Sequence, residues 1–410
     1  MLNRADVAVV TPWFPTDDHP YRGAFVQAMA DAVAPRCERV TVYHTEMWTT
    51  RMPRRARGSA VRALEALTPT ALRGRHTPAG VGVVCAPYPV RPDLSYSEYA
   101  LCHERALRVA LRRRPLAADL VHAHTGIFGG WAALHNVRPG TRVFVTEHAT
   151  FIDKIVREPR ARAMYDTVLS RAAGVFAVGE GLRTTIAEAF PHHAHRLGIL
   201  PNAVRFDLPR DLPVSDLRRW LYVGSIIPRK NIFALIEAFA RCRERDSALT
   251  LTLVGSGALY GRTWRLAKRL GVGDAVTFRG AVGPEAALAL LREHDLLVHP
   301  SQMETFGMTL IEAVAAGMPV LATRCGGPEE TLAGVEHMVG ELVEVQAGPD
   351  ALVDGYWRLR DRFPHGLDLA RAATDLAARY GYAAVAEAHL ATWSGTGGLD
   401  VAPMAEQAVR

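Results

Sequence analysis

Short apolar runs alternate with longer amphipathic stretches along most of the chain. Because many of these runs are rich in Val, Leu and other apolar residues, they predict strands. The thirteen predicted strands are 7–11, 40–44, 81–87, 120–124, 143–148, 175–179, 197–201, 220–224, 249–255, 275–280, 296–300, 319–323 and 341–345. Between the predicted strands lie stretches whose apolar residues have helical spacing, such as 23–34, 100–114, 232–244 and 284–293. This alternation predicts an α/β protein with parallel sheets covered by helices.

The number of predicted strands indicates two domains. Thirteen strands exceed what one ordinary open sheet holds, and 410 residues suffice for two hydrophobic cores. A polar, proline-bearing stretch without periodicity, 204–216, separates the two sets. We therefore expect one domain over 1–203 and a second over 217–378. The small-residue stretch 394–410 is expected to be a flexible tail.

The segment 301–317 holds the most informative chemistry. It follows a predicted buried strand, carries Glu304 in a loop, and passes through Phe306-Gly307 into a helix that contains Glu312. The N-terminus of a helix suits a phosphate, and carboxylates accept hydrogen bonds from sugar hydroxyls. Together these features indicate a nucleotide-sugar pocket. The alternative is that the two glutamates only complement the helix dipole.

A specific resemblance favours the pocket. The stretch 299–330 resembles the E-x7-E region of GT4-type glycosyltransferases in its Glu304–Glu312 spacing, its Phe306-Gly307 and its Gly-Gly-x-x-Glu turn. The resemblance implies the GT-B fold, in which two Rossmann-like domains with parallel sheets face a cleft. Residues 1–203 would bind the acceptor, 217–378 would bind the nucleotide-sugar donor, and a final helix, about 380–393, would return to the first domain.

The resemblance also implies roles in the second domain. The loop after Tyr222 resembles the family's G-R-L-x-x-x-K loop, which binds the donor diphosphate, through Gly224 and Lys230. Ser225 stands where the family has arginine, so Arg229 is the candidate substitute. The resemblance further implies that Glu304 binds the donor sugar, that Glu312 binds the ribose, and that the base lies near Arg279. The diphosphate would lie at the loop and helix start formed by Phe306, Gly307, Met308 and Thr309.

Histidines follow two strands of the first domain. His122 and His124 end one strand, and Glu147 and His148 end the next. Taken alone, they leave a metal site with His122, His124 and Glu147 open. The resemblance instead implies that His124 and His148 contact the donor sugar and acceptor hydroxyls without a metal, while His122 points inward. It also implies that Gly23, before a predicted helix, approaches the donor phosphate and the acceptor.

Composition and charge limit the classes of binding partner that we expect. The net charge of +6 is compatible with anionic ligands, and no zinc-finger spacing or RNA-binding motif indicates nucleic acid. Five scattered cysteines without C-x-x-C, and no apolar run long enough for a signal peptide or a membrane span, predict a cytoplasmic protein. The segment 51–75 has seven arginines and one glutamate. It is expected to be a solvated insertion, with contact to an anionic membrane as the alternative.

These observations lead to one expected activity. The protein is expected to be a retaining, metal-independent hexosyltransferase without a cofactor, with His124, Glu304 and Lys230 as catalytic residues and Gly23, His124 and His148 on the acceptor side. The donor would be a UDP- or GDP-sugar, and the acceptor a small molecule or glycan. The alternatives are a sugar-nucleotide epimerase and a catalytically silent nucleotide-sugar-binding subunit. The Ser225 and Ala203 departures from the family pattern give some weight to the silent subunit.

Overall fold

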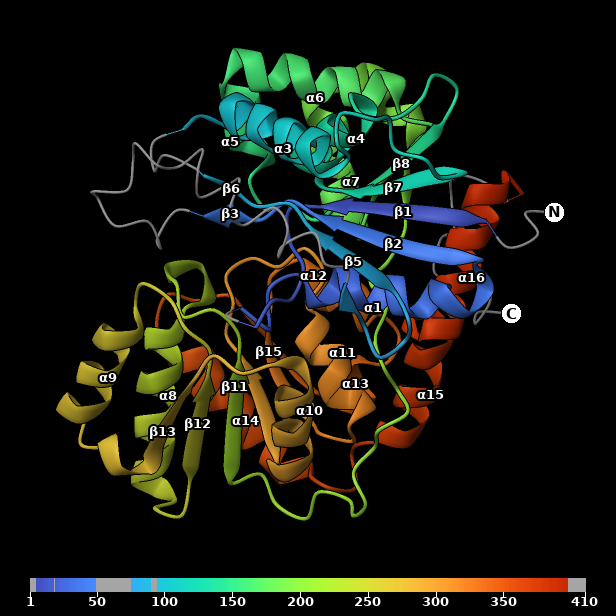
Figure 1. The fold of residues 1–410 in the computed structure, drawn as a ribbon. Coiled ribbons are helices and arrows are strands. Elements are labelled where there is room, and N and C mark those ends of the chain that lie inside the picture. Colours follow the sequence, from blue (N-terminus) through green and yellow to red (C-terminus); the bar gives the residue numbers. More distant parts are fainter. Residues whose placement is uncertain (1–4, 18, 49–74, 90–93, 397–410) are drawn as a thin grey trace. The chain divides into compact units, whose positions relative to one another are not determined.

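Two compact α/β units make up the chain (Figure 1). The computed structural model describes residues 5–17, 19–48, 75–89 and 94–396. Unit 1 comprises the described residues of 5–15, 22–203 and 385–396, and unit 2 those of 16–21 and 204–384. All thirteen predicted strands are present. The predicted insertion 51–75 and tail 394–410 lie outside the described residues, except for the residues at their edges.

The sheet of unit 1 has the strand order β10-β9-β8-β7-β1-β2-β5-β4 among the described residues. Within the described part of this sheet, the β4–β5 pair alone is antiparallel. A separate short pair joins β3 to β6. The two-residue strands β3, β4 and β6 were not predicted, because two residues show no periodicity. The strands are β1 Asp6–Thr11, β2 Arg39–His44, β3 Met47–Trp48, β4 Arg75–His76, β5 Gly82–Cys85, β6 Tyr88–Pro89, β7 Leu120–His124, β8 Arg142–Glu147, β9 Gly174–Ala177 and β10 Leu197–Ile199.

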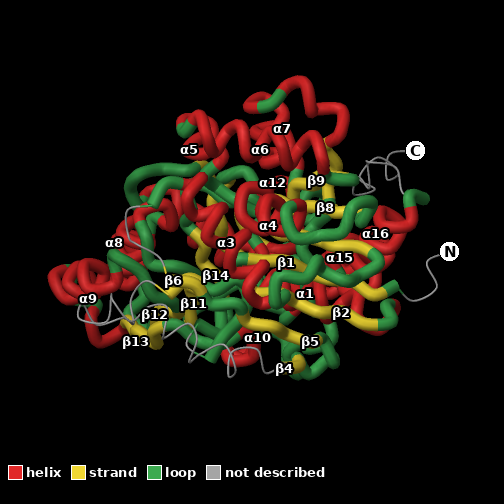
Figure 2. Tube along the Cα trace, turned by 45° about the horizontal axis from the view of Figure 1, so that its top comes forward, coloured by secondary structure: helices red, strands yellow, loops and turns green. Residues whose placement is uncertain are grey.

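Helices cover this sheet, and α3, α4 and α6 lie on one side of its central strands (Figure 1). Helices α5, α6 and α7 form a neighbouring group (Figure 2). The predicted helix 100–114 begins earlier, at Tyr96, because Ser95 and Glu98 form a capping box there. The helices of unit 1 are α1 Ala24–Val33, α3 Tyr96–Ala110, α4 Trp131–Leu134, α5 Ile152–Arg157, α6 Pro159–Arg171, α7 Glu180–Ala189 and, from Val385 onward, α16 Tyr382–Ser394.

The last helix, α16, is anchored in the core of unit 1. The Trp393 side chain is fully buried, and its indole N–H donates to Nδ1 of His122 at 3.1 Å. The carbonyl of Trp393 accepts a hydrogen bond from the guanidinium of Arg142 on β8. The end of α16 therefore packs against strands β7 and β8.

Unit 2 contains a parallel six-stranded sheet in the order β13-β12-β11-β14-β15-β16 among the described residues. Its strands are β11 Arg219–Val223, β12 Thr250–Val254, β13 Val276–Gly280, β14 Leu296–His299, β15 Val320–Arg324 and β16 Gly340–Glu344. Its helices are α8 Ile232–Arg245, α9 Tyr260–Arg269, α10 Pro284–Glu293, α11 Met308–Ala315, α12 Gly327–Thr331, α13 Glu336–Val339, α14 Asp350–Arg362 and α15 Leu369–Tyr380. No described helix in either unit is long and apolar enough to cross a membrane.

A cluster of aromatic rings fixes the centre of this sheet. Trp220 on β11 packs edge-to-face against Phe239 of α8 and Tyr356 of α14, with ring centroids 5.6 and 4.8 Å apart. Such contacts stabilise a core beyond the area they bury. Because β14 pairs with β11, the loops that leave these two strands are neighbours at the carboxyl edge of the sheet.

The anchoring of α16 leads to a stability prediction. Trp393→Ala removes a buried indole and leaves Nδ1 of His122 without its donor, so we expect it to lower the free energy of unfolding by about 3–5 kcal/mol. Trp264→Ala is the matched control, because Trp264 is 45% exposed and should cost about 1 kcal/mol or less. Urea denaturation followed by circular dichroism would measure both. Equal effects of the two substitutions would show that Trp393 does not anchor α16.

Candidate functional site

The loops after β11 and β14 bring Lys230 and Glu304 into contact. Lys230 ends a 3-10 turn, Pro228–Lys230, that follows β11, and its ammonium forms an ion pair with Oε1 of Glu304. Nε2 of His299, the last residue of β14, lies 2.8 Å from the same oxygen. The Arg229 guanidinium lies 3.8 Å from Oε2. One carboxylate is thus surrounded by three nitrogen-bearing side chains.

Backbone hydrogen bonds hold Glu304 in this position. Its N–H donates to the carbonyl of Cys325 at 3.1 Å, and its carbonyl accepts from the N–H of Gly327 at 3.0 Å. The guanidinium of Arg229 donates to the carbonyl of Met303 at 2.8 Å. The carboxylate and its cations are therefore positioned by three loops that leave neighbouring parallel strands, where open α/β sheets bind ligands.

The cluster is largely shielded from water. The Glu304, Lys230 and His299 side chains are 10%, 12% and 3% exposed. Burial opposes ionisation of Glu304, but the hydrogen bond from His299 and the charges of His299 and Lys230 together hold its pKa below the usual range. Burial lowers the pKa of His299 although Glu304 opposes this effect. Glu304, Lys230 and Arg229 together carry a formal net charge of +1, which suits an anionic ligand.

The start of α11 adds unpaired backbone donors beside this cluster. Gly307 has a φ of 82°, a conformation that strains residues with a Cβ atom. Helical residues begin at Met308, and the first N–H groups of a helix, here those of Met308 and Thr309, lack carbonyl partners within the helix. Phe306 is buried and packs edge-to-face on Tyr380 at 5.3 Å. The loop is thereby anchored while its N–H groups remain available to a phosphate.

Glu312 differs from the other acidic residue of the motif. It is the fifth residue of α11, so it lies beyond the first turn and does not complement the helix dipole there. Its carboxylate is partly buried and makes no hydrogen bond or ion pair that we find within the described part of the chain. Burial raises its pKa to about 7. A carboxylate without a protein partner is suited to accept hydrogen bonds from a ligand.

The other predicted donor residues lie directly after β11 and on β13. Gly224 follows β11 and donates its N–H to the carbonyl of Val254 at 2.9 Å, and Ser225 after it is exposed. Arg279 is exposed on β13, two strands away from β11 in the sheet order. The structure therefore groups Lys230, Arg229 and Glu304 closely but places Arg279 apart from them.

In unit 1, the ends of β7 and β8 bring His124 and His148 together. Their Nδ1 and Nε2 atoms, respectively, are 2.8 Å apart, while the remaining nitrogens, Nε2 of His124 and Nδ1 of His148, are buried and have no hydrogen-bond partner among the described residues. Phe25 of α1 packs its ring 4.4 Å from that of His148. Thr125, directly after His124, has a φ of 65°, a strained conformation for a β-branched residue. Two unsatisfied imidazole nitrogens and local strain are typical of a ligand-binding site.

Gly23 lies at the start of α1, two residues before Phe25. Its φ is 70°, and a Cβ atom there would lie 2.3 Å from the carbonyl carbon and oxygen of Trp13. A turn that passes this close to another backbone segment requires glycine. The close approach of Trp13 thus explains why a glycine occupies position 23. Phe25, two residues later, packs on His148, so Gly23 lies near the same edge of the sheet.

The alternative metal site is not supported by the positions of His122 and Glu147. His122 accepts from the Trp393 indole, so its Nε2 carries the proton and donates to Thr146 at 2.8 Å. Glu147 accepts from the N–H groups of Gly126, His148 and Ala149 and from the Tyr165 hydroxyl. Both side chains are engaged by protein groups. Among the described residues, the groups with metal-ligand spacing are His44–Glu46–Cys85 and Asp166–His192–His193.

The histidines of this region are uncharged. Burial lowers the pKa of His124 well below its ordinary value, helped by His148 and His389. Burial also lowers the pKa of His148 to about 3 and that of His389 to about 4. At neutral pH, His124 and His148 therefore offer hydrogen-bonding nitrogens without charge, which suits hydroxyl groups rather than phosphates.

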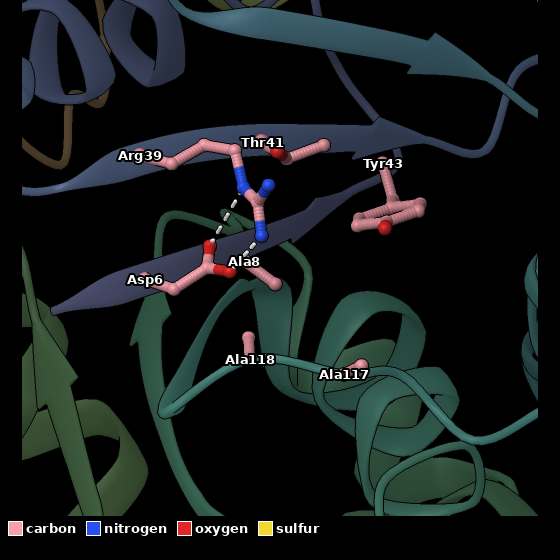
Figure 3. A pocket seen from close by; sticks show the side chains of 7 residues that line it. All are labelled: Asp6, Ala8, Arg39, Thr41, Tyr43, Ala117 and Ala118. Carbon is pink, nitrogen blue, oxygen red and sulfur yellow. Dashed lines mark hydrogen bonds and ion pairs between the residues drawn. The ribbon is translucent and has the colours of Figure 1, made fainter.

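A separate cavity lies at the amino end of β1 and β2 and is shown in Figure 3. It has a volume of about 300 Å³. Its lining includes Asp6 and Arg39, which form an ion pair, and Tyr43. In parallel sheets, ligands bind at the carboxyl ends of strands, so this cavity is not the candidate site.

His299 is the residue of the site that sequence reasoning missed. A single histidine at the end of an apolar strand has no distinctive spacing to another polar residue. The available signal was its position five residues before Glu304 at the carboxyl end of a buried parallel strand, where ligand-binding residues concentrate.

Family models match both units of the chain. The model for Glycosyltransferase Family 4 matches residues 6–208, and the model for Glycosyl transferases group 1 matches residues 207–359. D-inositol 3-phosphate glycosyltransferase of Streptomyces scabiei is 32% identical over 250 residues, 52% of this chain and 54% of that protein. The enzyme of the same name from Streptomyces griseus is 28% identical over 330 residues, 68% and 65% of the two chains. The alignments thus span about half to two thirds of these relatives.

Solved structures show the same fold. Sucrose-phosphate synthase from Thermosynechococcus elongatus superposes with a TM-score of 0.72 at 20% identity, covering 95% of this chain and 99% of that one. Anabaena HepE in complex with UDP-glucose gives a TM-score of 0.67 at 18% identity, covering 95% and 100%. Together with the two family matches and the two parallel-sheet units, these likenesses establish that the chain belongs to the GT4-type glycosyltransferases of GT-B fold.

Proposed function

We propose that this protein is a retaining glycosyltransferase that moves a hexose from a nucleotide-diphosphate sugar to an acceptor hydroxyl. The observation that carries the proposal is the Lys230–Glu304–His299 cluster beside the open start of α11. It combines surplus positive charge for a diphosphate with a fixed carboxylate for sugar hydroxyls. These are the two chemical groups that a sugar nucleotide presents together.

Each donor group has a counterpart in unit 2. The ammonium of Lys230 and the guanidinium of Arg229 bind the diphosphate, with Arg229 supplying the positive charge that Ser225 lacks. The N–H groups of Met308 and Thr309 add uncharged donors to the same oxygens. Glu304 orients the sugar, and the unpartnered Glu312 accepts the ribose hydroxyls. Arg279, on β13, is assigned to the neighbourhood of the base.

The donor class is also supported by related proteins. HepE was solved with UDP-glucose, and we infer a UDP- or GDP-sugar for this chain. The acceptor is a small molecule or glycan that unit 1 binds through His124, His148 and the turn at Gly23. The five cysteines are free thiols, which agrees with a cytoplasmic site of action.

The roles of these residues in the reaction follow from the position at which negative charge develops during transfer. As the bond from the anomeric carbon to the diphosphate breaks, negative charge grows on the leaving oxygen, and Lys230, Arg229 and the α11 N–H groups stabilise it. The acceptor hydroxyl attacks from the same face as the leaving group and passes its proton to the departing phosphate oxygen, so the anomeric configuration is retained. His124, held by His148, orients the reacting hydroxyls. Because the protein supplies cationic groups for the leaving diphosphate, we propose that transfer requires no metal ion.

A donor panel tests the activity and its metal independence together. We expect mass spectrometry to detect transfer from one UDP-, GDP- or dTDP-sugar to an acceptor, at an unchanged rate in excess EDTA and at a temperature where the chelated protein stays folded. Conversion of the donor alone would indicate an epimerase. Binding without conversion across a broad acceptor panel would indicate a silent subunit. A rate that collapses with EDTA and returns with Mn²⁺ would contradict metal independence.

The raised pKa of Glu312 makes donor affinity depend on pH. The carboxylate form accepts the ribose hydroxyls, and in the free protein this form predominates only above pH 7. We therefore expect the affinity for the intact sugar nucleotide to rise with pH up to about 7 and then to level off. Glu312→Gln should flatten this profile, and Glu312→Ala should cost roughly 1.5–3 kcal/mol of binding. Calorimetry that finds parent affinity in Glu312→Ala would rule out the ribose contact.

His124 should affect transfer more than donor binding, because it belongs to unit 1 while the diphosphate site belongs to unit 2. We expect His124→Ala to reduce kcat by about a hundredfold through lost positioning, with an unchanged donor dissociation constant. His192→Ala is the control, since the His192 side chain is 61% exposed. Steady-state kinetics and calorimetry give both quantities. A variant that turns over as fast as the parent would make His124 a structural residue.

A further inference from the structure

The ends of β2 and β5 place three potential metal ligands side by side. These strands are parallel, and His44 and Cys85 are direct partners in their register. The pairing continues past both strands, since the N–H of Ala86 donates to the carbonyl of His44 at 2.7 Å and that of Glu46 to the carbonyl of Ala86 at 3.1 Å. Side chains two residues apart in an extended segment share a face, so Glu46 joins His44 and Cys85.

The side chains converge as the backbone pattern predicts. A ring nitrogen of His44, a carboxylate oxygen of Glu46 and Sγ of Cys85 all lie within 4.8 Å of one another. The thiol of Cys85 donates to Oε2 of Glu46 at 3.3 Å. In a tetrahedral zinc site, bonds of about 2.3 Å to sulfur and 2.0 Å to nitrogen place two ligand atoms roughly 3.5 Å apart. Shifts of roughly 1.3 Å or less between ligand atoms therefore bring the three groups to one ion.

His44 is the observation that distinguishes a ligand site from a chance cluster. Its side chain is buried, with 1% of the residue exposed, and its Nε2 has no hydrogen-bond partner in the part of the chain that the structure describes. A buried nitrogen without a partner is costly, and a metal ion bound by this nitrogen would remove that cost.

We propose that His44, Glu46 and Cys85 form a binding site for Zn²⁺ or a similar transition-metal ion in unit 1. One nitrogen, one carboxylate oxygen and one sulfur make a ligand set that zinc accepts and that magnesium or calcium does not favour. Cys85 binds as the thiolate, and its proton passes to the solvent. Three protein ligands leave a fourth position of a tetrahedral ion for water or another donor.

The other group with metal-ligand spacing, Asp166–His192–His193, does not combine its spacing with a buried nitrogen that lacks a partner. His192 and His193 each lie within hydrogen-bonding distance of Asp166, at 2.8 and 3.2 Å, so the polar atoms are already paired. The Asp166 and His192 side chains are 40% and 61% exposed. This group serves as the comparator for adventitious metal binding at surface histidines.

The ion would tie the end of β2 to the end of β5, and none of its three ligands is among the residues assigned to sugar transfer. Its expected effect is on stability. A ligand that binds only the folded state raises the melting temperature by mass action. Stripping the metal should therefore lower the melting temperature of the full chain without changing its transfer rate at a temperature where it stays folded.

Cobalt titration of the full-length, chelator-stripped protein tests the site. Co²⁺ bound to a thiolate gives a charge-transfer band in the near ultraviolet, and we expect one equivalent to produce it. Cys85→Ser should abolish the band, while Glu46→Gln and His44→Ala should each weaken Co²⁺ binding at least about tenfold. Cys325→Ser, which removes another partly buried thiol, and His192→Ala, which disrupts the comparator group, should behave like the parent.

Zinc supplies the second readout. Zn²⁺ should raise the melting temperature of the parent, Cys325→Ser and His192→Ala, but not that of Cys85→Ser. Should Cys85→Ser fail to fold by circular dichroism, Glu46→Gln decides the outcome, because Glu46 is only partly buried. A parent that gives no thiolate band, a band and zinc stabilisation that persist in Cys85→Ser, or a Co²⁺ affinity of Glu46→Gln equal to that of the parent would overturn the proposal.

Discussion

The candidate donor site depends on one buried carboxylate, that of Glu304. Removing a charge from water is costly unless nearby groups compensate. Here the Lys230 ammonium, Nε2 of His299 and, at longer range, the Arg229 guanidinium provide that compensation. These side chains can meet because β11 and β14 are adjacent in the sheet, and the loop of Glu304 is fixed by hydrogen bonds to the loop after β15.

This arrangement pre-organises the site for an anion. Lys230 is held in place by Glu304 before any ligand binds, so less side-chain entropy is lost on binding. The cluster keeps a surplus positive charge, and the start of α11 contributes uncharged donors. The histidine pair of unit 1 is neutral by contrast, because burial suppresses protonation of His124 and His148. The charged groups of unit 2 suit phosphate, and the neutral groups of unit 1 suit hydroxyls.

The sequence predicted the parts of the fold that have strong patterns. Long apolar runs marked the thirteen principal strands, whereas β3, β4 and β6 were too short to show a period. The start of α3 was missed because Ser95 and Glu98 form a capping box before the predicted range. Lys230 and Glu304 were identified by motif, but His299 was not. The hydrogen bonds of Glu147 and the proton position on His122 needed the three-dimensional contacts.

The central claim is that Lys230 and Glu304 compensate one another in a largely buried site, and a double-mutant cycle measures this directly. The free energies of unfolding of the parent, Lys230→Met, Glu304→Gln and the double variant would be compared by urea denaturation. Each single variant leaves one buried charge without its main partner, so the double variant should cost less than the sum by at least about 1.5 kcal/mol. Effects that add within about 0.5 kcal/mol would show an exposed, weak pair and contradict the account.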